Sequence, residues 1–259
     1  MKNKEIISVM KRYELKFVLT SEQLSLFKSR ISEFMKVDKY GLTTIASLYY
    51  DEPKFSLINK SIEKPKFKEK IRLRSYGLAS EDSEVFLEIK RKLDGIVYKR
   101  RICTTEEEVN NYLFKDGEFG EEQISRELVS FKESHPNLEP KYLIIYDRTA
   151  YYQDNSDVRI TIDLNPRFRV NNLNLHTSME GTPLLKNGGA ILEVKVQHSI
   201  PLWLSKILTE LKIYINSFSK VGEAHKIELQ HYMLEKENII ENLYQFNENK
   251  GELKYGYII

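Results

Sequence analysis

Basic side chains recur at every second position in several parts of the sequence. In the segment 67–76, the apolar residues Phe67, Ile71 and Leu73 alternate with a basic series, which is Lys68, Lys70, Arg72 and Arg74. Successive side chains of a β-strand point to opposite faces, so this spacing predicts a strand with one apolar and one cationic face. Arginine forks and lysine ammonium groups are well suited to phosphate oxygens. The spacing therefore indicates an anionic ligand.

The same sorting of the other predicted strands gives a large excess of positive charge. Their charged faces hold twelve bases and three acids, an excess of nine: Lys16, Lys68, Lys70, Arg72, Arg74, Lys90, Lys92, Lys99, Arg101, Arg148, Arg159 and Lys195 against Glu14, Glu88 and Glu193. One charged face is ordinary for a sheet with one side in water. Uncompensated like charges on adjacent strands repel, however, unless an anion lies among them. We therefore expect these faces to bind a polyanion such as a linear phosphate chain.

The elements that must position these residues follow from the hydrophobic periodicity. Alternation predicts eight strands, at 11–18, 43–50, 67–76, 84–93, 96–104, 140–153, 157–163 and 190–197. Helices are expected at 21–36 after the cap candidate Thr20-Ser21, at 105–114 after Thr104-Thr105, and at 120–134, 201–215 and 222–246. The dipeptide Asp94-Gly95 predicts a tight hairpin, and 186–189 predicts another turn.

Eight strands can close into a barrel whose interior holds one small ligand. The local charge supports such a site, because residues 64–101 carry a balance of +6 whereas 102–140 carry −7. We predict an α+β fold in one domain over residues 1–259: an antiparallel eight-stranded tunnel barrel with a charged interior, covered by helices.

The composition excludes several other classes of protein. The net charge is only +2, and the single cysteine, Cys103, excludes an intrachain disulfide and a multi-cysteine metal site. Apolar runs reach about five residues, against roughly 18 needed to span a bilayer. We expect a cytoplasmic protein whose association with a membrane, if any, runs through a partner protein. Because the charged faces hold almost no aromatic residues, we expect no nucleic-acid partner.

Eight short stretches carry a resemblance to a known family through their order along the chain: 12–17, 47–51, 70–74, 86–91, 146–150, 158–163, 192–195 and 218–220. Together they resemble the polyphosphate polymerase (VTC) domain of the triphosphate tunnel metalloenzymes. The resemblance implies a tunnel-shaped barrel that binds triphosphate, pyrophosphate or polyphosphate with Mn²⁺ or Mg²⁺. It further implies an enzyme that transfers the γ-phosphate of ATP to a growing phosphate chain.

The resemblance also implies roles for individual residues. The phosphate ligands would be Lys16, Arg72, Arg74, Lys90, Lys99, Arg148, Arg159 and Lys220, with a hydrogen bond from Ser219. Glu193 would hold the metal, with Glu14 or Glu88 as a further candidate ligand. The charged faces add Lys70, Lys92, Arg101 and Lys195 to this anion-binding set.

Two alternative functions stay open: a metal-dependent inorganic or nucleoside triphosphatase on the same fold, and a non-catalytic module that binds polyphosphate or nucleotides. Hydrolytic members of the superfamily carry Glu-x-Glu-x-Lys on the first strand. This chain has Arg12 in place of the first glutamate, ahead of Glu14 and Lys16. Loss of that carboxylate weakens activation of a metal-bound water, which favours a polymerase over a triphosphatase.

Overall fold

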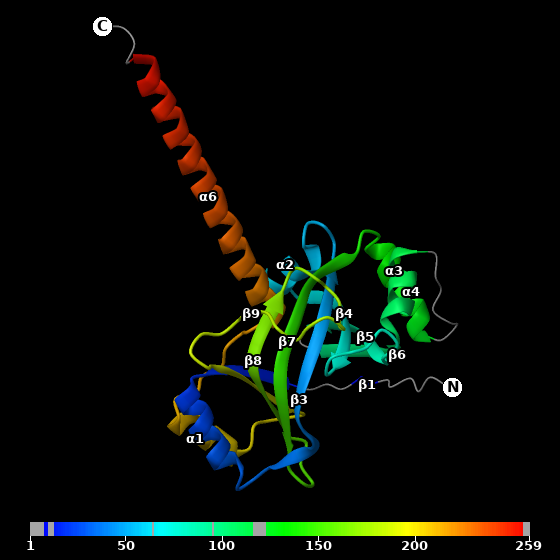
Figure 1. Cartoon of the computed structure of the whole chain (residues 1–259). Helices are drawn as coiled ribbons and strands as arrows, with labels where there is room; N and C mark the ends of the chain where they lie inside the picture. The colour runs from blue at the N-terminus through cyan, green and yellow to red at the C-terminus, as the bar shows by residue number, and fades with distance from the viewer. Residues whose placement is uncertain (1–7, 10–12, 64, 95, 116–122, 256–259) are drawn as a thin grey trace. The chain divides into compact units, whose positions relative to one another are not determined.

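The fold is an antiparallel sheet with helices, seen in a computed structural model that describes residues 8–9, 13–63, 65–94, 96–115 and 123–255 (Figure 1). The strands are β1 (Ser8–Val9), β2 (Tyr13–Leu19), β3 (Lys36–Asp51), β4 (Phe67–Tyr76), β5 (Val85–Leu93), β6 (Ile96–Thr104), β7 (Glu139–Tyr152), β8 (Arg159–Arg169), β9 (Thr182–Pro183) and β10 (Ala190–Val196). The helices are α1 (Ser21–Ile31), α2 (Ser56–Glu63), α3 (Glu106–Phe114), α4 (Gln123–Ser134), α5 (Leu202–Glu210) and α6 (Lys220–Tyr255).

The chain divides into two compact units, Met1–Gly222 and Glu223–Ile259. The first unit contains all the strands and the first residues of α6, and the second contains the rest of that helix. None of the helices in the described residues combines the length and hydropathy that crossing a bilayer requires.

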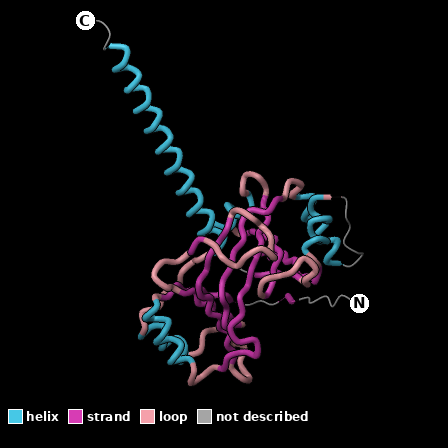
Figure 2. Tube along the Cα trace, viewed as in Figure 1, coloured by secondary structure: helices cyan, strands magenta, loops and turns pink. Residues whose placement is uncertain are grey.

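The strands, drawn in magenta in Figure 2, form one sheet. Their order in it is β1-β6-β5-β4-β3-β7-β8-β10-β2, with β9 paired to β8. Five strands separate β5 from β2 in this order, and a flat sheet would hold those two about 29 Å apart at a strand spacing of about 4.8 Å. Yet Lys90 Nζ on β5 lies 3.2 Å from Glu14 Oε2 on β2. The sheet must therefore curl until the two charged faces meet.

This curled sheet confirms the predicted antiparallel α+β fold with a charged interior. It differs from the prediction in two ways. Among the described residues the sheet has ten strands, because β1 and β9 add two residues each. Within those same residues, no backbone ladder joins the end strands β1 and β2, so the barrel is not closed by hydrogen bonds.

The apolar faces of the strands point outward, and helices cover them. One apolar cluster joins Leu48, Leu73 and Leu87 of the sheet to Leu57 of α2, Val109 of α3 and Phe131 of α4. A second cluster joins Phe17, Ile160 and Leu192 to Phe27 of α1 and Ile207 of α5. Burial of these side chains favours the curled sheet, because it removes the apolar face from water and leaves the charged face inside.

Capping residues fix where the predicted helices begin. Thr20 accepts a hydrogen bond from the backbone N–H of Gln23, and Thr105 accepts one from that of Glu108. The Gln23 and Glu108 side chains in turn accept from the backbone N–H of the two threonines, which completes a capping box at α1 and at α3. Both sequence cap candidates are therefore confirmed.

Three helix ends were predicted wrongly, and one of them is the end of 222–246, since α6 continues to Tyr255. The helix 21–36 stops at Ile31, and Lys36 already belongs to β3, where it pairs with Tyr152. The helix 201–215 stops at Glu210, because Lys212 adopts a left-handed conformation (φ 53°) and Ile213 donates its backbone N–H back to Leu208. Tertiary pairing ends the first helix and a local C-terminal cap ends the second, although the helical pattern continues in the sequence in both cases.

The sequence reading missed α2, whose start is fixed by Asp51 at the end of β3. The Asp51 carboxylate is buried and accepts backbone hydrogen bonds from Glu52 (2.7 Å), Leu57 (2.9 Å) and Ile58 (2.8 Å). The bonds from Leu57 and Ile58 satisfy N–H groups at the helix start that have no partner within the helix. Asp51 therefore connects the end of β3 to the start of α2. It is not a member of the anion-binding site.

Both predicted turns are in place. Strand β5 ends at Leu93 and β6 begins at Ile96, with Asp94 at φ 46°, while Gly95 lies outside the described residues. In the second turn, Asn187 and Gly188 have φ values of 55° and 67°. Positive φ at the central residues is typical of tight turns of this type.

Candidate functional site

Glu88 is the centre of one group of cations in the curled interior. Its side chain is 1% exposed, and its oxygens lie 2.8 Å from Arg72 Nη2, 2.8 Å from Lys99 Nζ, 3.0 Å from Arg101 Nε and 3.7 Å from Arg74 Nη1. Burial by itself would raise the pKa of Glu88, but Arg72, Arg74 and Lys99 hold that pKa well below its usual range. Glu88 is thus an ionised anchor that fixes cations from β4 and β6, the two strands beside its own.

Asp163 and Glu193 form a second anionic centre. Asp163 is fully buried. Its Oδ1 lies 2.5 Å from Arg148 Nε, and its Oδ2 accepts a hydrogen bond from Arg148 Nη2 at 2.8 Å. Lys220 donates a hydrogen bond to the same Oδ2. Despite burial, Lys220 and Arg148 lower the pKa of Asp163. Two cations that lie far apart in the sequence are therefore held by one carboxylate.

The contacts of Glu193 are longer than those of Asp163. Its carboxylate lies 3.3 Å from Lys16, 3.5 Å from Arg148, 3.7 Å from Lys195 and 3.9 Å from Lys220. Burial opposes ionisation, yet these four cations hold the pKa of Glu193 well below its usual value. Glu193 is therefore ionised but loosely held, which leaves its oxygens available to a stronger ligand.

Glu14 joins the end strand β2 to β5, which lies on the far side of the sheet order. It lies 3.4 Å from Lys16 on its own strand and 3.2 Å from Lys90 on β5. Burial by itself would raise the pKa of Glu14, but the two lysines outweigh burial and lower this pKa to about 2. This pair brings β5 within reach of the Glu193 group, so the charges of separate strands act on one enclosed region.

Tyr146 connects the Glu88 and Asp163 groups. Its hydroxyl accepts a hydrogen bond from Arg74 Nη2 at 3.2 Å, and Lys220 and Arg148 lie 4.4 Å and 5.0 Å from its ring centroid. Burial raises the pKa of the phenol, but Arg74 and Arg148 outweigh burial and lower it. On the other side of the Glu88 group, Tyr49 Oη accepts from Arg72 Nη1 at 2.8 Å.

Lys70 is the cation least compensated by acids in this region. Its Nζ donates to Ser219 Oγ at 3.2 Å, and the same oxygen accepts from the backbone N–H of Gly222 at 3.3 Å. Burial, followed by repulsion from Lys16 and Lys90, places the pKa of Lys70 well below its usual value. Because two donors occupy the lone pairs of Ser219, its own O–H is left to donate to a ligand.

Two predicted site residues lie at the margin. Lys92 is exposed near the end of β5, and Arg159 is exposed at the start of β8, where its guanidinium lies 5.4 Å from the Tyr152 ring centroid. The register places Lys92 beside Lys68, and Arg159 beside Lys195. Like charges therefore face each other at these margins. Arg12, the position that departs from the superfamily motif, lies outside the described residues.

The resulting interior charge cluster contains ten cations and four carboxylates, an excess of six positive charges: Lys16, Lys70, Arg72, Arg74, Lys90, Lys99, Arg101, Arg148, Lys195 and Lys220 with Glu14, Glu88, Asp163 and Glu193. Two of the carboxylates, Asp163 and Glu88, lie deeper than the cations, whereas the Glu14 side chain is 21% exposed. Asp163 is fully buried and Glu88 is 1% exposed, whereas 38% of the Lys90 side chain is exposed. Acids thus hold the cations from behind, and the remaining N–H donors can bind an anion.

A divalent metal would have to share this cluster with its substrate. The described residues contain no group of three or more acidic, histidine or cysteine side chains suited to a metal. Glu88 fits poorly as a ligand, because three cations lie within 3.0 Å of it. Glu193, with no contact shorter than 3.3 Å among its ion pairs, fits a metal that takes most of its ligands from phosphate oxygens and water.

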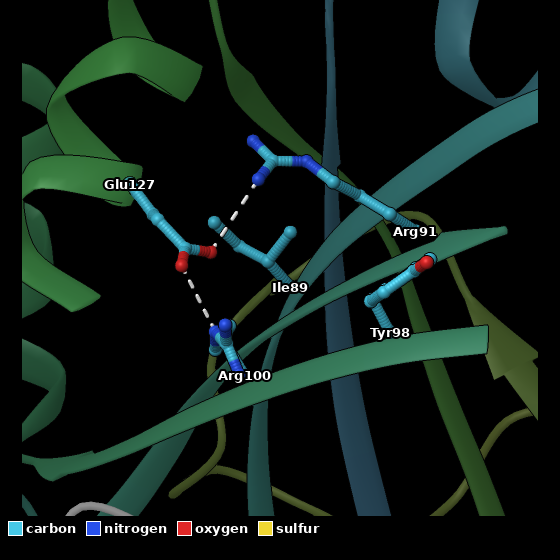
Figure 3. Close-up of a pocket in the computed structure, with 5 residues that line it drawn as sticks. All are labelled: Ile89, Arg91, Tyr98, Arg100 and Glu127. Atoms are coloured by element: carbon cyan, nitrogen blue, oxygen red, sulfur yellow. Dashed lines mark hydrogen bonds and ion pairs between the residues drawn. The ribbon is translucent and has the colours of Figure 1, made fainter. Parts of the chain in front are cut away.

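A cavity of about 240 Å³ lies on the opposite face of β5 and β6, under α4 (Figure 3). Its lining includes Arg91 and Arg100, which both contact Glu127, with Arg100 Nε at 2.9 Å and Arg91 Nη1 at 3.5 Å. Arg91 Nε also pairs with Glu69 at 3.0 Å. Two arginines against two glutamates leave no excess charge, so this cluster attaches α4 to the sheet and does not attract a polyanion.

Sequence reasoning missed three members of the site: Asp163, Tyr146 and Tyr49. Asp163 shares the parity of Arg159 on β8, so alternation places it on the charged face but gives it no role. Tyr146 and Tyr49 lie on the interior face of β7 and β3, where the register pairs them with Ile45 and Arg72. Their phenols connect arginines, which only the side-chain geometry reveals.

Comparison with known proteins agrees with this architecture. The VTC domain model matches residues 11–228. A candidate adenylate cyclase from Bacillus halodurans shares the fold at 12% identity, with a TM-score of 0.50 over 81% of this chain and 96% of that one. A candidate adenylyl cyclase from Hippeastrum, described as having a dominant triphosphatase activity, aligns at 15% identity with a TM-score of 0.49 over 82% and 94%. No curated protein sequence matches the chain significantly.

The family match covers every member of the interior charge cluster, from Lys16 on β2 to Lys220 at the start of α6. A curled antiparallel sheet with cations inside and helices outside is also the architecture that the resemblance implied. The chain therefore belongs to the VTC domain family.

Proposed function

We propose that this protein is an ATP-dependent polyphosphate polymerase. The observation that carries the proposal is the excess of six positive charges in the interior charge cluster, contributed by strands that meet only because the sheet curls. Such an excess is costly without an anion, and an extended anion with a charge on every unit neutralises it best. Membership of the VTC family supports a linear phosphate chain as that anion.

The cations are arranged to bind successive phosphates. Arg148 uses Nε and Nη2 for Asp163, so Nη1 stays available to a phosphate oxygen. Lys220 is tethered to the same carboxylate, and Ser219 beside it has a free O–H to donate. Groups held in this way lose little conformational entropy when the ligand binds, which favours both affinity and alignment.

In the proposed reaction, a terminal oxygen of the growing chain attacks the γ-phosphorus of ATP. A new P–O bond forms, the bond between the γ-phosphorus and the β,γ-bridging oxygen breaks, and ADP leaves with that electron pair. The nucleophile is already an anion, so no general base is required. The cluster would act by holding the two phosphates in line and by neutralising the equatorial oxygens.

A divalent ion, Mn²⁺ or Mg²⁺, would add neutralisation of the phosphate oxygens, with Glu193 as its protein ligand. Glu14 is the second candidate, because it is ionised at neutral pH and lies near Lys16, which also contacts Glu193. Glu88 is assigned a positioning role on account of its close cation partners.

The direct test is a gel of the products formed from ATP with Mn²⁺ or Mg²⁺. Long phosphate chains support a polymerase, free phosphate alone supports a triphosphatase, and salt-sensitive binding without turnover supports a binding module. Truncation of Arg72, Arg148 or Lys220 to alanine removes charge-assisted hydrogen bonds of about 1.5–3 kcal/mol each, so chain synthesis should fall at least tenfold.

Arg91→Ala is the matched control. Arg91 is also an arginine with two carboxylate partners, but it projects from the other face of β5 (Figure 3). Its removal should leave chain synthesis near the wild-type rate once equal folding has been verified by thermal unfolding. Equal loss of activity in Arg91→Ala and Arg72→Ala, or full activity in all three interior variants, would reject the assigned site.

A further inference from the structure

Two aromatic side chains interrupt the charged rows at one end of the interior. Tyr76 and Phe86 continue the rows that contain Arg74 and Glu88, and their rings meet edge to face with centroids 5.7 Å apart. Tyr76 is 49% exposed. An exposed tyrosine is unremarkable by itself, but here it follows directly on arginines assigned to phosphates.

Arg101 joins this ring pair to the Glu88 group. Its guanidinium carbon lies 3.8 Å from the Phe86 centroid and 5.5 Å from that of Tyr76, and its Nη2 donates to Tyr76 Oη at 2.6 Å. On its other side, Nε lies 3.0 Å from Glu88. The planar guanidinium is therefore held between a phosphate-binding region and two aromatic rings.

Inorganic polyphosphate gains nothing from aromatic rings, because it has no π-face and no apolar surface. A nucleoside triphosphate carries both a charged chain and a planar base, and base–aromatic stacking contributes about 1–3 kcal/mol. Two residues along a strand cover roughly 7 Å. Tyr76 therefore lies about a sugar's length beyond Arg74, where the base of a nucleotide bound through its phosphates would fall.

We propose that Tyr76, Phe86 and Arg101 form the subsite for the base of the nucleoside triphosphate donor. Tyr76 and the guanidinium of Arg101 supply stacking surfaces, and Phe86 supports the guanidinium from behind. The contacts are to the face of the base, so the subsite accepts purines and pyrimidines and favours the larger purine surface. This inference rests on the proposed function and specifies how the donor is distinguished from the polymer.

The test compares the affinity of ATP with that of inorganic triphosphate by titration calorimetry. Neither titration contains a divalent metal, so binding is measured without turnover. Tyr76→Ala should weaken ATP binding about tenfold, within the 5- to 150-fold range that stacking predicts, and should change triphosphate binding less than twofold. Tyr76→Phe keeps the ring and should retain the ATP affinity. Tyr76→Leu keeps apolar bulk without a π-face and should behave like Tyr76→Ala.

Tyr40→Ala is the control, since Tyr40 is also exposed, at 70%, but lies on β3 outside the interior charge cluster. The base subsite is refuted if ATP and triphosphate affinities fall together in Tyr76→Ala, or if Tyr76→Leu binds ATP like wild type. Failure of the wild-type protein to bind either ligand would instead overturn the proposed function, so the two failures are distinguishable.

Discussion

Replacement of Glu88 by glutamine removes one negative charge from among four cations while keeping the shape of the side chain. The carboxylate is 1% exposed and lies within 3.0 Å of Arg72, Lys99 and Arg101. Removal of one partner from a buried ion pair costs about 3–5 kcal/mol. These cations are between 18% and 35% exposed, so water screens part of their repulsion. We expect a loss of about 2–4 kcal/mol.

That loss corresponds to a fall in the unfolding temperature of about 4–16 °C for a unit of this size. Thermal and urea unfolding of the ligand-free protein measure it. Glu210→Gln provides the control, because Glu210 also pairs with an arginine, Arg30 at 2.7 Å, but is 42% exposed. Its loss should stay below about 1 kcal/mol.

The pH dependence gives a second readout of the same anchor. The pKa of Glu88 in the folded protein lies well below the value of about 4.3 expected in the unfolded chain. Its contribution to stability is therefore complete above about pH 5 and is lost as the pH falls. Glu88→Gln should lose less stability than wild type on acidification. If Glu88→Gln matches Glu210→Gln in both experiments, Glu88 does not anchor the cations.

Two further predictions concern Lys99 and Asp51. Burial outweighs the ion pair with Glu88 and lowers the pKa of Lys99 to about 8. The ammonium group therefore deprotonates above pH 8, and the affinity for inorganic triphosphate should fall by up to about tenfold per pH unit there. Calorimetry should find this decline reduced in Lys99→Arg, and an identical decline in both proteins would contradict the assignment. Asp51→Ala leaves two backbone N–H groups of α2, and that of Glu52 before the helix, without their acceptor, and it should cost about 2–4 kcal/mol in urea unfolding. Asp38→Ala removes one hydrogen bond from the backbone N–H of Tyr40 and should cost less than about 1 kcal/mol, and similar losses would argue against the cap.

Local patterns predicted much of the fold because strand and helix signals depend on near neighbours. β4 and β6 have the predicted bounds, and the caps at Thr20 and Thr105 lie where the sequence indicated. The errors occurred where contacts beyond the repeat of the helix or strand itself decide the outcome. Lys36 leaves the predicted helix to pair with Tyr152, and α2 depends on hydrogen bonds to Asp51.

The sequence determined which residues carry charge and which face of each strand they occupy, because side-chain alternation is a property of the strand itself. It could not determine how the strands curl, since that depends on helices packing against the outer face along the whole sheet. Only the tertiary structure brought Glu14 to Lys90, Lys70 to Ser219, and Arg148 and Lys220 to one carboxylate. The same curvature decides which charged rows share an interior and which acids hold the cations from behind.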